Sequence, residues 1–124
     1  MLSTSEIVKK YNLAGRSELG QNFLLRNDIL EKIVVSAGDL AGTDVLEIGP
    51  GPGGLTRAIL ESNPRRLVAV ELDQCLVDVL NTEMRPFFNN LEIISGDALK
   101  INENELFSDR FRIVANLPYN IGTT

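Results

Sequence analysis

Four short apolar runs, separated by loops and helical patterns, constrain the fold of this chain more than any other feature. The runs cover residues 44–48, 66–70, 91–95 and 111–115. They lack clean alternation of apolar and polar residues, which is typical of parallel strands covered on both faces. Right-handed crossovers between such strands give a doubly wound parallel sheet, and ligands bind at the carboxyl ends of its strands. The sequence therefore predicts an α/β, Rossmann-like fold with four strands.

Helical spacing of apolar residues places the helices between these strands. We expect a short helix over residues 4–13, and a second helix from Asn27 to about Ala37 that stops at Gly38. Two more helices are predicted over residues 55–62 and from Asp73 to about residue 84. Asn27 and Asp73 are good N-cap residues, and glycine is the usual residue after a helix C-terminus.

Composition narrows the function classes. The 124 residues fit one domain, the net charge is −5, and there is no histidine and one cysteine. The lack of histidine excludes imidazole catalysis and histidine metal ligands, and a lone cysteine excludes an intramolecular disulfide and fits a reducing, cytoplasmic setting. No apolar stretch approaches the ~20 residues of a membrane span, and the N-terminus lacks signal-peptide features. The acidic balance on its own argues against a nucleic-acid-binding surface.

The first strand runs into a loop rich in glycine and proline. Gly49, Gly51 and Gly54 satisfy the spacing G-x-G-x-x-G, so a dinucleotide such as NAD is one candidate ligand. Pro50 and Pro52 remove two backbone N–H donors from the loop. This suits a pyrophosphate poorly and a neutral or cationic ligand better.

Acidic residues follow the next two strands. Glu71 ends the second strand, where a carboxylate accepts hydrogen bonds from ribose hydroxyls in NAD and in S-adenosylmethionine alike. Asp73 is better explained as a helix cap. Asp97 follows the third strand, and it either closes an Asx turn or accepts a hydrogen bond from an adenine amine.

The fourth strand leads into Asn116-Leu117-Pro118-Tyr119. The Asn116 amide oxygen and a backbone carbonyl of Leu117 or Pro118 can accept hydrogen bonds from an NH2 group, and the Tyr119 ring can stack on a flat heterocycle. A strand-ending turn is the alternative. Because all four motifs follow strand ends, we expect them to converge on one crevice.

These motifs, together with Gly20-Gln21-Asn22-Phe23-Leu24, resemble the ribosomal small-subunit RNA adenine N6-dimethyltransferase family, of the kasugamycin-sensitivity methylase type. The resemblance runs from about residue 20 to the last residue. It implies S-adenosyl-L-methionine as cofactor and dimethylation of two adjacent adenines in small-subunit rRNA (the 30S precursor) during ribosome biogenesis.

The resemblance also implies roles for individual residues. Asn22 and Leu24 would line the methionine end of the cofactor, and Gly49 and Gly51 would lie against its backbone. Glu71 would hold the ribose, Asp97 the adenine amine, and Asn116 both cofactor and target amine. Leu117, Pro118 and Tyr119 would complete the target-adenine site. In-line transfer from a sulfonium needs alignment more than a general base, which fits a chain without histidine.

Family members are longer and add a C-terminal helical domain, so the chain looks like their N-terminal part. We expect residues 1–25 to form an N-terminal helix and lid-like segment, and residues 26–124 a partial cofactor-binding domain truncated after the fourth strand. We expect this piece to bind cofactor weakly, to methylate rRNA poorly or not at all, and to self-associate through the edge of the fourth strand. A non-catalytic methyltransferase-like module in ribosome assembly or transcription, and an NAD-binding oxidoreductase, are the alternatives.

Overall fold

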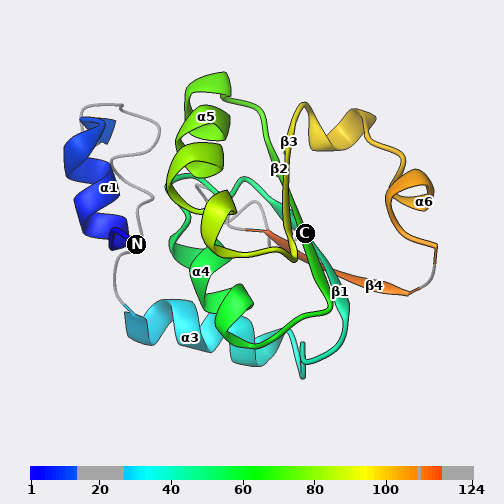
Figure 1. The fold of residues 1–124 in the computed structure, drawn as a ribbon. Coiled ribbons are helices and arrows are strands. Elements are labelled where there is room, and N and C mark those ends of the chain that lie inside the picture. The colour runs from blue at the N-terminus through cyan, green and yellow to red at the C-terminus, as the bar shows by residue number, and fades with distance from the viewer. Residues whose placement is uncertain (14–26, 109, 116–124) are drawn as a thin grey trace.

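A four-stranded parallel sheet in the order β3-β2-β1-β4 forms the centre of the molecule (Figure 1). The computed structural model describes residues 1–13, 27–108 and 110–115. The strands are β1 (Asp44–Ile48), β2 (Arg66–Glu71), β3 (Leu91–Ser95) and β4 (Phe111–Ala115). The predicted α/β class is confirmed, and three of the four strands have the predicted bounds, whereas β2 runs one residue further, through Glu71.

Register brings the carboxyl ends of the strands to one edge. Ile48 of β1 lies opposite Val70 of β2 and Ala115 of β4, and Glu71 lies opposite Ser95 of β3. The residues that follow each strand therefore leave the sheet side by side, as expected for a ligand crevice in this class of fold.

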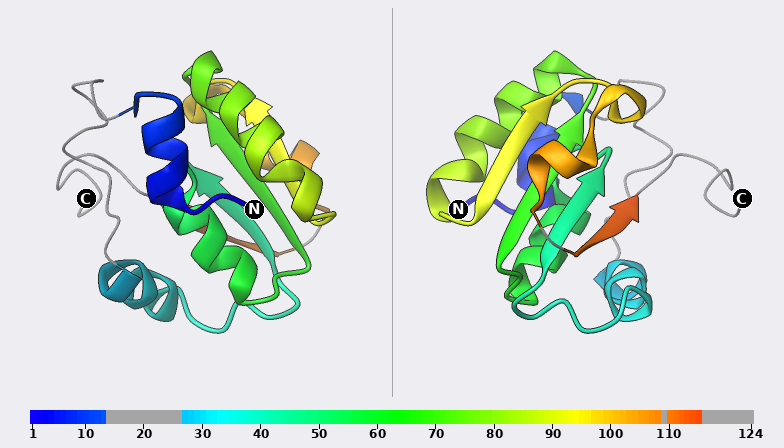
Figure 2. Two further views of the ribbon diagram at one scale, coloured as in Figure 1. Left: turned by 60° about the vertical axis from the view of Figure 1, so that its left-hand side comes forward. Right: turned by 90° about the vertical axis from the view of Figure 1, so that its right-hand side faces the viewer.

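Three helices cover one face of the sheet: α3 (Asn27–Ser36), α4 (Gly54–Glu61) and α5 (Gln74–Glu83). Their apolar residues form the main core with one side chain from each strand (Figure 2). Leu30 on α3, Ile59 on α4 and Leu80 on α5 are all buried there. The expected caps are also present, since Asp73 accepts the Cys75 N–H at 2.9 Å and Gly38 has a φ of 88°.

The opposite face of the sheet packs against a chain segment between β3 and β4. This segment holds the 3-10 helix η3 (Ala98–Lys100) and α6 (Glu103–Leu106). Phe107 is buried against Leu46, Val68 and Val70, and its ring stacks on Phe111 at 4.7 Å between centroids. Sequence periodicity predicted neither of these helices nor η2 (Arg85–Phe87), because three or four residues are too few to show a repeat.

The N-terminal helix α1 (Thr4–Lys10) packs on α5. It begins with a capping box between Ser3 and Glu6, and Lys10 Nζ lies 2.8 Å from Glu83 Oε2. It ends three residues before the predicted boundary, because Tyr11 is its C-cap and Asn12 adopts a φ of 54°. Within the described residues, no helix is long and apolar enough to cross a membrane.

Candidate functional site

The glycine loop after β1 adopts a backbone that suits glycine. Gly49, Gly51 and Gly53 have φ values of 70°, 56° and 95°, a region that other residues avoid. The Gly53 N–H donates to the Pro50 carbonyl at 3.0 Å and closes the turn into α4. A Cβ added at Gly51 would meet no atom within 4 Å. The loop therefore leaves room beside Gly51 for a ligand to approach the backbone.

Glu71 and Gly51, predicted separately as cofactor residues, are brought into direct contact. The Gly51 N–H donates to Glu71 Oε1 at 3.1 Å, and the Asp73 N–H donates to Oε2 at 2.9 Å. Glu71 is only 8% exposed. Two backbone donors thus fix the orientation of this carboxylate at the carboxyl edge of the sheet, and they leave lone pairs on both oxygens for a ligand.

Glu47, to which the sequence analysis gave no role, is the most unusual charged group beside this loop. It is fully buried, and its Oε1 accepts the Thr56 hydroxyl at 2.6 Å. Its Oε2 is buried and has no hydrogen-bond partner among the described residues. Burial raises the pKa of Glu47 to about 8; the Thr56 hydrogen bond lowers it, and the Glu71 carboxylate raises it. A glutamate inside a strand expected to be buried on both faces was the sequence signal.

Asp97 lies at the same edge, after β3. Its side chain accepts the Leu99 N–H at 2.9 Å and caps η3. The preceding Gly96 donates its N–H to the Glu71 carbonyl at 3.0 Å, which ties the end of β3 to the end of β2. The Asx-turn alternative is thus realised, and the second carboxylate oxygen remains as an acceptor for a ligand.

Two exposed leucines flank these carboxylates. Leu72 follows Glu71 and is 74% exposed, and Leu99, two residues after Asp97, is 94% exposed. Leucine side chains of this exposure offer apolar surface to a flat ring. Nothing in the sequence alone distinguishes them from ordinary loop residues, so they were not predicted.

Six predicted site residues lie outside the described residues: Asn22, Leu24, Asn116, Leu117, Pro118 and Tyr119. The last described position before Asn116 is Ala115, which pairs with Ile48 directly before the glycine loop. Among described residues, no group of three or more histidine, cysteine or acidic side chains is arranged to hold a metal ion.

The chain is similar to known RNA methyltransferases in sequence. Residues 12–124 match the family described as ribosomal RNA adenine dimethylase. The protein named ribosomal RNA small subunit methyltransferase A from Ruegeria sp. (strain TM1040) is 47% identical over 118 residues. That match covers 95% of this chain, which spans only 42% of the length of the relative.

Solved structures agree with this match. A dimethyladenosine transferase from Plasmodium falciparum superposes with a TM-score of 0.60 and 33% identity, covering 77% of this chain and 34% of that one. The 23S rRNA methyltransferase ErmE gives a TM-score of 0.68 and 28% identity, covering 82% of this chain and 40% of that one. With the family match extending over most of its length, the chain belongs to the ribosomal RNA adenine dimethylase family.

Proposed function

We propose that this chain is the S-adenosyl-L-methionine-binding part of an enzyme that dimethylates N6 of two adjacent adenines in small-subunit rRNA. The contact between Glu71 and Gly51 at the carboxyl edge of the sheet carries the proposal. It joins a ribose-accepting carboxylate to a loop whose backbone a ligand can approach. Family membership supplies the adenine substrate and the rRNA context.

The described residues fit this cofactor. The open space beside Gly51 admits close backbone approach, and Glu71 offers lone pairs to two ribose hydroxyls. Asp97 would accept the adenine amine, and the exposed Leu72 and Leu99 would contact the ring. The bound cofactor supplies a methyl group on a positively charged sulfur, and acidic groups at this edge favour that charge over a second anion such as pyrophosphate.

We assign the remaining roles to residues on either side of the described core. Asn22 and Leu24 would close over the methionine end of the cofactor as part of a lid-like segment within residues 1–25. Asn116 would hold the target amine with a carbonyl of Leu117 or Pro118, and Tyr119 would stack on the adenine. These acceptors would direct the amine lone pair toward the methyl group, and single-stranded RNA would make unstacking of the base cheaper.

The proposal includes where and how the chain acts. We place the enzyme in the cytoplasm, where its small-subunit RNA substrate is assembled. Residues 26–124 would form part of the cofactor-binding domain. Because the chain spans 42% of the relative's length, we expect this piece alone to bind cofactor weakly and to methylate slowly. β4 pairs only with β1 among described strands, so we also expect self-association along its free edge.

Single-turnover methyl transfer tests this function. The chain, in molar excess over undermethylated 30S subunits, is incubated with S-adenosylmethionine, and the RNA is digested and analysed by mass spectrometry. We expect slow formation of N6-methylated adenines that Asn116→Ala abolishes, with Asp78→Asn on the exposed side of α5 as the control. Methylation at another base, no methylation after exhaustive incubation, or equal activity of Asn116→Ala would contradict the proposal.

A further inference from the structure

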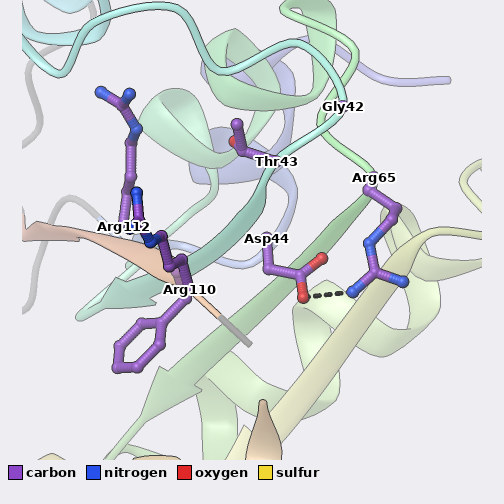
Figure 3. A pocket seen from close by; sticks show the side chains of 7 residues that line it. Gly42, Thr43, Asp44, Arg65, Arg110 and Arg112 are labelled. Atoms are coloured by element: carbon purple, nitrogen blue, oxygen red, sulfur yellow. Dashed lines mark hydrogen bonds and ion pairs between the residues drawn. The ribbon is translucent and has the colours of Figure 1, made fainter. Parts of the chain in front are cut away.

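A pocket lies at the amino ends of β1, β2 and β4, at the opposite edge of the sheet from the glycine loop. It has a volume of about 510 Å³, and its lining includes Asp44 and three arginines, Arg65, Arg110 and Arg112 (Figure 3). The arginines come from two separate places in the chain, the start of β2 and the start of β4. We call it the arginine pocket.

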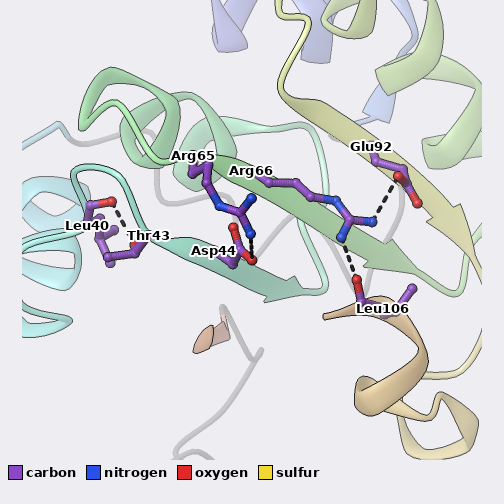
Figure 4. Close-up of polar contacts among 7 residues, drawn as sticks. All are labelled: Leu40, Thr43, Asp44, Arg65, Arg66, Glu92 and Leu106. Atoms are coloured by element: carbon purple, nitrogen blue, oxygen red, sulfur yellow. Dashed lines mark hydrogen bonds and ion pairs between the residues drawn. The ribbon is translucent and has the colours of Figure 1, made fainter. Parts of the chain in front are cut away.

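Positive charge is concentrated there against the trend of the molecule. The chain carries a net charge of −5, yet the pocket sets three arginines against one carboxylate. That carboxylate, Asp44, is 3% exposed and pairs with Arg65, whose side chain is 63% exposed. Figure 4 shows that Arg65 turns to Asp44, whereas Arg66 turns away to the Leu106 carbonyl and Glu92.

The arginines keep donors for a ligand after their structural contacts are counted. A guanidinium has five N–H donors in a planar fork. Arg65 uses Nη2 on Asp44, and Arg112 uses Nη1 on the Ala37 carbonyl at the end of α3. Arg110 and Arg112 are both exposed. The buried Asp44 and the carbonyl of Ala37 therefore hold two of the forks in place without consuming them.

We propose that the arginine pocket binds a phosphodiester segment of RNA. Guanidinium forks match phosphate oxygens in geometry and charge. The volume exceeds that of a single small anion and lies in the range of pockets that take nucleotide-sized groups. The assignment to RNA, rather than to another polyanion, rests on the function proposed above.

Distance limits what this contact does. β1 has five residues, so at ~3.3 Å per residue the pocket lies roughly 15 Å from the glycine loop. A phosphate bound there belongs to the backbone flanking the target adenine and takes no part in methyl transfer. The pocket would contribute affinity and orientation, and its contribution would fall with added salt.

Arg110→Gln tests the pocket with little disturbance, because it leaves the Arg65–Asp44 pair and the Arg112–Ala37 hydrogen bond in place. The probe is a fluorescein-labelled RNA hairpin of about 20 nucleotides with two adjacent loop adenines, and anisotropy is measured over a salt series. We expect severalfold weaker binding and a salt slope smaller by about 1. Arg85→Gln, at an exposed arginine on η2, is the matched control and should bind as the unsubstituted chain does. Equal binding by Arg110→Gln and the unsubstituted chain would overturn the proposal.

Nitrogen-15 NMR identifies the ligand class. RNA should shift the Arg65 and Arg112 side-chain Nε–H signals and the Gly42 amide more than inorganic phosphate or polyglutamate does at equal charge. Stronger shifts with polyglutamate would indicate an acidic protein partner, and equal shifts with phosphate would indicate a small-anion site; either result overturns the RNA assignment. S-adenosylhomocysteine binding, measured on the same samples, reports separately on the function proposed for the glycine loop.

Discussion

Glu47 shows how one buried carboxyl group couples the glycine loop to pH. It lies beneath the loop with one oxygen bonded to Thr56 and the other without a partner among the described residues. Burial removes the water that would stabilise the ionised form, so the protonated form persists near neutral pH. A cationic ligand beside the loop would favour the ionised form instead.

The raised pKa of Glu47 predicts a stability that declines with pH. Between its ordinary value of 4.5 and about 8, the folded protein holds a proton on Glu47 that the unfolded chain has lost. The free energy of unfolding should therefore fall as pH rises through this window, by at most ~1.4 kcal/mol per pH unit from this group. Glu47→Gln cannot ionise and keeps an acceptor for Thr56, so it should flatten the decline.

Urea denaturation at half-unit pH steps measures this effect. Glu105→Gln, at an exposed glutamate on α6, serves as the control and should retain the full decline. If Glu47→Gln and the unsubstituted chain lose stability in parallel from pH 5 to 8, then Glu47 does not carry the proton that we assign to it.

At the scale of elements, Gly53 joins the loop to α4 by close packing. Its φ is 95°, and a Cβ there would collide with Met84 Sδ and come within 3.0 Å of Leu80 Cδ2. Gly53→Ala should therefore combine backbone strain with overpacking and lower the free energy of unfolding by about 2–4 kcal/mol. Gly42, with φ 70° and no atom within 4 Å of a Cβ, provides the comparison.

Gly42→Ala should cost only about 1 kcal/mol, since it meets backbone strain without a collision. Thermal unfolding of both variants, followed by circular dichroism, separates the two contributions. Equal losses for the two substitutions would show that packing against α5 and Met84 does not restrict Gly53.

The accuracy of prediction at this scale follows the length of each pattern. β1, β3 and β4 were predicted with the observed bounds, because apolar runs flanked by polar residues mark a buried strand clearly. The start of α4 was off by one residue, because Gly54 belongs to the glycine motif and has low helix propensity. The short helices between β3 and β4 pack through Phe107, a tertiary contact that local patterns do not report.

The candidate site divides along the same line. Contact between Gly51 and Glu71 follows from parallel strands whose ends meet at one edge, so it was predictable from residue order. The role of Glu47 was not, since its pKa depends on full burial and on the Thr56 hydroxyl that α4 brings to it. The arginine pocket was missed because its residues are separated in sequence and the net charge is negative.

At the scale of the whole molecule, the free edge of β4 predicts association between copies. Ile113 on this strand is 55% exposed, and an uncharged strand edge favours pairing with another strand. Ile113→Lys should reduce any dimer seen by sedimentation velocity, because charge opposes edge pairing. Val35→Lys, at a residue 75% exposed on α3, is the control and should not change the dimer. A monomer at every concentration, or equal effects of both substitutions, would contradict association through β4.

Calorimetric titration with S-adenosylhomocysteine tests the central claim most directly, since that claim places an adenosine cofactor between the glycine loop and Glu71. We expect the unsubstituted chain and Asp78→Asn to bind S-adenosylhomocysteine alike and to bind NAD undetectably. Glu71→Gln removes the charge that would accept the ribose hydroxyls, so it should weaken binding by at least about tenfold. Binding of NAD as tight as that of S-adenosylhomocysteine, or unchanged affinity in Glu71→Gln, would contradict the account.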